Sequence, residues 1–94
     1  MSIHNNTKLL IEQRLKAEFA PIHLEVIDDS AAHQGHTEAT LHPQAGHFRI
    51  VMTSALFTNK TPVMRHRMVY EVLSDLMDSK IHALALTLKT AENC

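Results

Sequence analysis

The spacing of apolar residues changes along this chain, and the order of the changes restricts the fold. Over residues 7–19, apolar side chains recur every three or four positions, as in an amphipathic helix. Over residues 23–28 and 47–54, apolar and polar residues alternate, which is typical of strands with one buried face. A second helical stripe begins at Thr61, and residues 82–88 alternate again. The order predicts an α+β fold, a two-layer α-β-β-α-β sandwich with both helices on one face of a three-stranded sheet.

Local signals place the ends of the helices. Asn6 or Thr7 can cap the first helix, because a side-chain oxygen there accepts a hydrogen bond from a free amide of the first turn. Pro21 follows the last apolar residue and is expected to stop this helix. Thr61 and Pro62 supply a capping hydroxyl and a proline suited to the first position of the second helix.

Alternation also assigns the faces of the strands. The core side of the second strand is predicted to carry Phe48, Ile50 and Met52, and the other side His47, Arg49, Val51 and Thr53. The second helix is expected to continue to a linker at about residues 78–81. In the last strand, His82 is expected to share one face with Leu84, Leu86 and Leu88.

The chain is long enough for one domain and too short for two. Its 94 residues predict a single domain over residues 1–94, with a core over about residues 7–88. No apolar run approaches the roughly 20 residues of a membrane helix, and the N-terminus does not resemble a secretory signal, so a cytoplasmic protein is expected. The formal net charge of −1 gives no argument for nucleic acid as a partner.

Histidine is frequent in this chain and cysteine is rare. There are eight histidines and one cysteine, Cys94, which is the last residue and cannot by itself form a disulfide or a thiolate cage. His33, His36 and His42 lie in a polar connection over residues 29–46. A connection of this length in so small a domain is usually functional or disordered.

Two groups of residues follow the pattern of a known family. The first comprises residues 23–30, a histidine-containing loop and Gly46-His47-Phe48-Arg49-Ile50-Val51. The second comprises Phe57, Arg65-His66-Arg67-Met68-Val69-Tyr70, Leu73 and His82-Ala83-Leu84-Ala85-Leu86. Together they resemble the BolA-like proteins over about residues 8–88. The resemblance implies an α-β-β-α-β fold related to the class II KH domain, in agreement with the order derived from spacing.

The resemblance also implies a role in iron homeostasis. BolA-like proteins form heterodimers with monothiol glutaredoxins and share a [2Fe-2S] cluster, to which the glutaredoxin side contributes its cysteine and a glutathione thiol. The cluster serves iron–sulfur trafficking or iron-dependent regulation, and the isolated chain holds none. Carried over to this sequence, the family's histidine ligands are His82, which opens the last strand, and His33 in the loop. His36 and His47 are the alternates to His33.

Histidine suits this chemistry. A neutral imidazole is a good iron ligand, and two imidazoles bind one iron of the [2Fe-2S] cluster in Rieske proteins. Thiolates from another molecule would complete the coordination shell. Without the resemblance, His82 beside Leu84 is better interpreted as a packed or hydrogen-bonded histidine, and the loop histidines as solvated residues. The spacing His33-x-x-His36 is a weak pattern for a divalent metal ion.

One turn departs from the family pattern. The family usually has Phe-x-Gly where this chain has Phe57-Thr58-Asn59. Asparagine is the residue besides glycine that best tolerates a positive φ, so the turn is expected to form.

BolA-like proteins have also been regarded as DNA-binding transcriptional regulators of stress response and cell morphology. DNA binding is therefore the alternative function. Lys60, Arg65 and Arg67, near the start of the second helix, are the candidate phosphate contacts. A KH domain clamps nucleic acid with Gly-x-x-Gly, which Gly35 and Gly46 cannot form. Aromatic residues for base stacking are few, so partner binding is the stronger hypothesis.

Catalytic motifs are missing from the sequence. It contains no nucleophile elbow, no phosphate-binding loop and no cysteine beside a histidine within the predicted core. Asp28-Asp29-Ser30 is interpreted as turn chemistry at the end of a strand. The chain is therefore expected not to be an enzyme.

Overall fold

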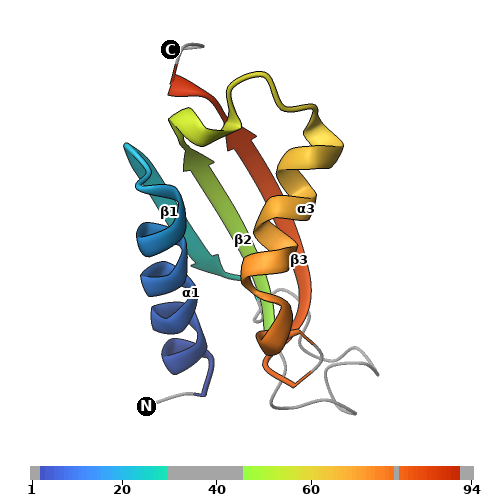
Figure 1. Cartoon of the computed structure of the whole chain (residues 1–94). Coiled ribbons are helices and arrows are strands. Elements are labelled where there is room, and N and C mark those ends of the chain that lie inside the picture. The colour runs from blue at the N-terminus through green and yellow to red at the C-terminus, as the bar shows by residue number, and fades with distance from the viewer. Residues whose placement is uncertain (1–2, 30–45, 78, 92–94) are drawn as a thin grey trace.

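A computed structural model describes residues 3–29, 46–77 and 79–91. The elements are α1 (Ile3–Phe19), β1 (His23–Asp28), β2 (Gly46–Thr53), the short helix η2 (Ala55–Phe57), α3 (Pro62–Val72), the short helix η3 (Ser74–Leu76) and β3 (Ile81–Lys89) (Figure 1). This is the order of helices and strands that the sequence predicts. None of the helices in these segments combines the length and apolar character needed to cross a membrane.

The three strands form one mixed sheet in the order β1-β2-β3. β1 pairs antiparallel with β2, and β2 pairs parallel with β3. A parallel pair needs a long crossover, which η2, α3 and η3 provide. Both α1 and α3 lie on the same face of the sheet (Figure 1), which confirms the predicted two-layer α+β architecture.

The hydrophobic core fills the space between the helices and the sheet. Phe48, Ile50 and Met52 of β2 are all buried, as predicted from alternation. Buried residues of the helical segments face them: Ile11, Leu15, Phe19, Phe57, Val69, Leu73 and Leu76. The ring centroids of Phe19 and Phe57 are 5.2 Å apart, and this contact joins the end of α1 to η2. The opposite face of the sheet carries exposed residues such as Arg49 and Thr87.

The first helix begins earlier than predicted. It starts at Ile3, so Asn6 and Thr7 lie inside it and neither is the cap that was expected. The reason is packing, because Thr7 is buried and continues a line of buried positions four residues apart through Ile11 and Leu15. At the other end, Ala20 has a left-handed φ of 43° and its amide donates to the Lys16 carbonyl at 3.2 Å.

The second helix begins as predicted and ends sooner. The Thr61 side chain accepts a hydrogen bond from the Met64 amide at 3.1 Å, and Pro62 is the first helical residue. The α-helix stops at Val72, and η3 replaces the expected last turn. Arg14 of α1 donates to the Val72 carbonyl at 3.4 Å, so a side chain from the other helix occupies a carbonyl where the helix ends.

The turn between η2 and α3 forms around Asn59. Its φ of 65° lies in the left-handed region, which confirms the prediction that asparagine replaces the glycine of the family pattern here. The Lys60 amide donates to the Phe57 carbonyl at 3.0 Å and closes the turn.

Candidate functional site

Two histidines meet at one end of the sheet. His47 is the second residue of β2 and His82 is the second residue of β3, and because these strands are parallel both lie at the same sheet end. The centroids of the two imidazole rings are 4.9 Å apart, with the ring planes inclined at 55°. Both residues are half-buried, so the pair lies at the surface of the protein and not in its core.

A β-bulge brings His82 to this position. Gly46 pairs with Ile81, but the next pair is His47 with Ala83, which leaves His82 as an extra residue in β3. Ile81 is fully buried, and Leu84, three residues later, packs against the same core. With strict alternation these two residues would face opposite sides of the sheet.

The bulge corrects one expectation from the sequence. His82 was expected to share a face with Leu84, Leu86 and Leu88, and this is wrong at the first position of the series. Leu84 packs against the core, whereas the His82 ring packs against that of His47, which alternates with the buried Phe48. The extra residue moves the imidazole out of register with the leucines.

Main-chain hydrogen bonds fix the residues that flank segment 30–45 next to this pair. The Asp29 amide donates to the His47 carbonyl at 2.8 Å, and the Gly46 amide donates to the Lys80 carbonyl at 3.1 Å. The Arg49 guanidinium also lies 3.2 Å from the Asp29 carboxylate. The sequence does not signal this ion pair, because it depends on how β1 and β2 are aligned.

The structure accounts for some of the predicted ligands. His82 and the alternate His47 are brought together, whereas His33 and His36 lie outside the described residues, so their roles stay predictions. Cys94 is outside them as well. In the part of the chain that is described, no group of three or more His, Cys, Asp or Glu residues could hold a metal ion. Among the described residues, the potential metal ligands at this end of the sheet are therefore the two imidazoles.

The three basic residues of the alternative site have different surroundings, and Lys60, just before α3, is half-buried. Arg65 is half-buried, and its Nε and one terminal nitrogen donate to the carbonyls of Lys60 and Leu88 at 2.9 and 3.1 Å. The bond to the Leu88 carbonyl ties the start of α3 to the end of β3. Arg67 is exposed on the outer side of α3, where it lines a pocket of about 360 Å³ with Tyr70. Arg67 is thus better placed than Arg65 to contact another molecule.

Comparison with known proteins gives consistent matches across most of the chain. The family model of BolA-like proteins matches residues 15–93. The DNA-binding transcriptional regulator BolA of Escherichia coli K12 is 38% identical over 76 residues, which cover 81% of this chain and 68% of that protein. SufE-like protein 1 of Arabidopsis thaliana is 39% identical over 85 residues, which cover 85% of this chain and 22% of that longer protein.

Solved structures show the same fold. The BolA domain of SufE1 from Arabidopsis thaliana superimposes with a TM-score of 0.82 at 34% sequence identity. The superposition covers 94% of this chain and 95% of that domain, so it includes the helices and the sheet that carry the histidine pair.

Proposed function

Because the chain belongs to the BolA-like protein family, we propose that it binds a monothiol glutaredoxin as a heterodimer and shares a [2Fe-2S] cluster with it. The glutaredoxin contributes its cysteine and a glutathione thiol, and this chain contributes imidazoles. The complex acts in iron–sulfur trafficking or iron-dependent regulation, and the chain serves as a binding partner without catalytic activity.

The observation that carries the proposal is the contact between His47 and His82. Two imidazoles at a half-exposed sheet end form a donor set that suits iron, and sulfur ligands can reach such a surface site from another molecule. When bound, the cluster supplies a one-electron redox centre and an iron–sulfur unit that can be transferred. The bulge holds His82 at this surface while Ile81 anchors the strand in the core.

His82 is the ligand common to every version of this proposal. For the second ligand, His33 is the first candidate, with His36 and His47 as alternates. His33 follows Asp29 by four residues, so an extended chain limits their separation to about 14 Å. The Asp29 amide donates to the His47 carbonyl, so the length of chain after Asp29 permits His33 to reach the pair. His47 needs no such tether, because its ring already contacts that of His82.

Reconstitution tests the proposal. The chain is mixed anaerobically with a monothiol glutaredoxin, ferrous iron, sulfide and glutathione, and the complex is followed by size-exclusion chromatography and visible absorption. We expect a coloured heterodimer with the wild-type chain, and loss or a spectral change with His82→Ala. His23→Ala is the matched control, since His23 is an exposed histidine of β1 that pairs with Glu25. A wild-type chain that forms no complex, or a His82→Ala variant identical to wild type, contradicts the proposal.

DNA binding is the second candidate function. It is supported by the name of the Escherichia coli relative and by the exposed position of Arg67. If DNA is the ligand, affinity falls steeply with salt, and Arg67→Ala weakens binding and reduces the salt dependence. Binding that is weak at all salt concentrations and insensitive to Arg67→Ala argues against this function.

A further inference from the structure

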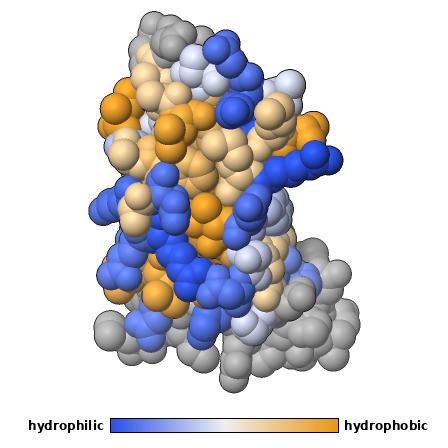
Figure 2. Space-filling model, viewed as in Figure 1, coloured by the Kyte–Doolittle hydropathy of each residue, from blue (hydrophilic) through white to orange (hydrophobic). Residues whose placement is uncertain are grey.

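A groove runs between α1 and α3, on the helical side of the molecule. It has a volume of about 810 Å³ and lies between residues of α1, η2 and α3. Figure 2 shows hydrophobic residues exposed in the upper middle of this face, with hydrophilic residues at both sides and across the face below them. The histidine pair lies elsewhere, at the starts of β2 and β3, so the groove is a separate surface.

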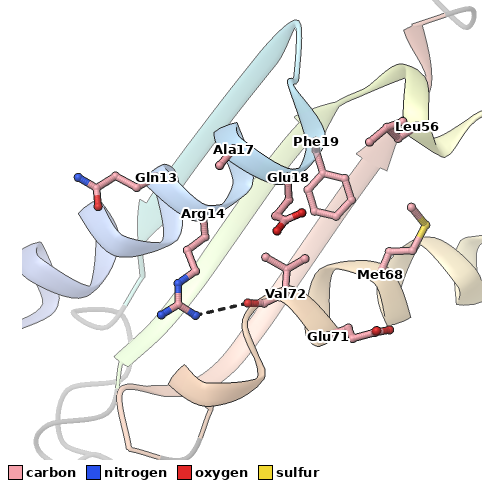
Figure 3. Close-up of a pocket in the computed structure, with 9 residues that line it drawn as sticks. All are labelled: Gln13, Arg14, Ala17, Glu18, Phe19, Leu56, Met68, Glu71 and Val72. Carbon is pink, nitrogen blue, oxygen red and sulfur yellow. Dashed lines mark hydrogen bonds between the residues drawn. The ribbon is translucent and has the colours of Figure 1, made fainter.

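The lining of the groove is partly apolar. Leu56 of η2 is 51% exposed, and Met68 and Val72 of α3 are half-buried although they pack against the core. The Phe19 ring forms part of the lining beside Leu56 (Figure 3). Burial of this apolar surface against another molecule removes it from water, which favours binding.

The rim of the groove is acidic. Arg14 lines it, but its guanidinium already bonds the Asp75 carboxylate and the Val72 carbonyl. Glu18 and Glu71 line the groove from opposite helices (Figure 3), and neither side-chain carboxylate has an ion-pair or hydrogen-bond partner among the residues the structure describes. Once Arg14 and Asp75 neutralise each other, the two glutamates leave a net negative charge beside the apolar surface.

We propose that this groove docks a basic amphipathic polypeptide segment, with an apolar side chain over Leu56 and Met68 and a lysine or arginine beside Glu18 or Glu71. Grooves between helices commonly receive the apolar face of another helix. A small ligand is a poorer fit, because small-molecule sites enclose most of their ligand, whereas Leu56, Glu18 and Glu71 in this lining are exposed to solvent. Nucleic acid is a poorer fit as well, because the two glutamates repel phosphates.

The docking is independent of the cluster proposed above. The groove uses residues of the helices, and the cluster uses imidazoles at the strand ends, so one chain can hold both partners at once. Failure of one proposal therefore leaves the other standing. A variant such as Leu56→Ser, which removes apolar surface from the groove, is expected to leave cluster assembly with a glutaredoxin unchanged.

Two synthetic helical peptides serve as probes. The first carries leucines on one face with lysines beside them, and the second has glutamate in place of every lysine. Each is titrated into the ¹⁵N-labelled 94-residue chain, and amide shifts are mapped by NMR. We expect the lysine peptide to shift amides in residues 13–19, 56 and 68–72, with saturation, and the glutamate peptide to bind at least tenfold more weakly.

Substitutions then test the two components of the groove. Leu56→Ser should weaken binding of the lysine peptide about tenfold, whereas Ile22→Ser, at an exposed apolar residue outside the groove, should not change it. The double substitution Glu18→Gln and Glu71→Gln should weaken binding about threefold to tenfold. Glu12→Gln, on α1 but outside the groove, is the charge control.

Three results would overturn the proposal. The first is equal affinity for the lysine and glutamate peptides. The second is a set of amide shifts that lies away from α1, η2 and α3. The third is no saturable binding of the lysine peptide up to about 1 mM, which corresponds to a binding free energy of only about −4 kcal/mol.

Discussion

The imidazole ring of His82 packs against that of His47, although Leu84, only two residues further along the same strand, packs against the core. A bulge between the first and second residue pairs of β2 and β3 makes this arrangement possible. Ile81 is buried and Leu84 packs against the core, whereas His82, the extra residue of the bulge, lies at the surface. The fold thereby holds the two imidazoles together at its surface while Ile81 stays buried in the core.

Ala20, which follows the last residue of α1, has a backbone conformation that suits glycine better than alanine. Ala20 adopts a left-handed φ of 43°, where its Cβ is crowded by the backbone. We expect Ala20→Gly to raise the free energy of unfolding by about 0.5–1 kcal/mol. The measurement is urea denaturation at pH 7. Ala17→Gly, at an exposed position inside the same helix, is the control and should lower stability by a similar amount. If Ala20→Gly had a lower free energy of unfolding than Ala17→Gly, the strained conformation assigned to Ala20 would be contradicted.

Arg65 is expected to act on stability, because it ties α3 to the end of β3. Arg65→Ala removes two hydrogen bonds to main-chain carbonyls and should lower the free energy of unfolding by about 1–2 kcal/mol. Arg65→Lys should recover only part of the loss, since an ammonium group cannot reproduce the planar geometry of the guanidinium. The comparison is Arg67→Ala, which removes an exposed side chain and should unfold at the wild-type urea concentration. Equal stability of Arg65→Ala and Arg67→Ala would count against this role.

The ion pair between Arg14 and Asp75 should make stability depend on pH in the acid range. The hydrogen bond from Arg14 holds the pKa of Asp75 below its ordinary value of 3.8. A lowered carboxylate pKa in the folded state adds stability above pH 3.8, and this stability is lost as the pH falls through the folded value. Asp75→Asn should therefore be less stable than wild type at pH 7, and the difference should shrink below pH 4.

Urea denaturation of both proteins at pH 7, 4 and 3 measures this difference. Glu12→Gln is the control, because Glu12 is an acidic residue of α1 that takes no part in this ion pair. A difference between Asp75→Asn and wild type that stays constant with pH would show that the carboxylate charge is not the cause.

Local patterns in the sequence predict much of the fold. The alternation of residues 47–52 and the Thr61-Pro62 start of α3 depend on neighbours along the chain, and both are confirmed. The alternation of burial stops at Thr53, which was predicted on the side away from the core and is buried. Asn59 is predicted for the same reason, because the conformational tolerance of a residue is local.

Contacts between distant residues account for what the sequence does not predict. α3 ends at Val72, where a carbonyl accepts a hydrogen bond from Arg14, a residue 58 positions earlier. The face of His82 depends on the alignment of β3 with β2, and a bulge leaves no mark in the alternation of a single strand. For the candidate site, the sequence supplies the residues His82 and His47, and the structure supplies their contact.

In the proposed heterodimer, an imidazole of this chain binds the iron of the shared cluster. The most direct test is pulsed electron paramagnetic resonance on the reduced heterodimer, with only this chain labelled with ¹⁵N-histidine and the glutaredoxin left at natural abundance. We predict strong ¹⁵N couplings in the wild-type heterodimer and the loss of one coupled nitrogen in His82→Ala. Substitution of whichever of His33, His36 or His47 is the second ligand should also remove one coupled nitrogen. Couplings absent from the wild-type heterodimer, or unchanged by His82→Ala, would contradict the account.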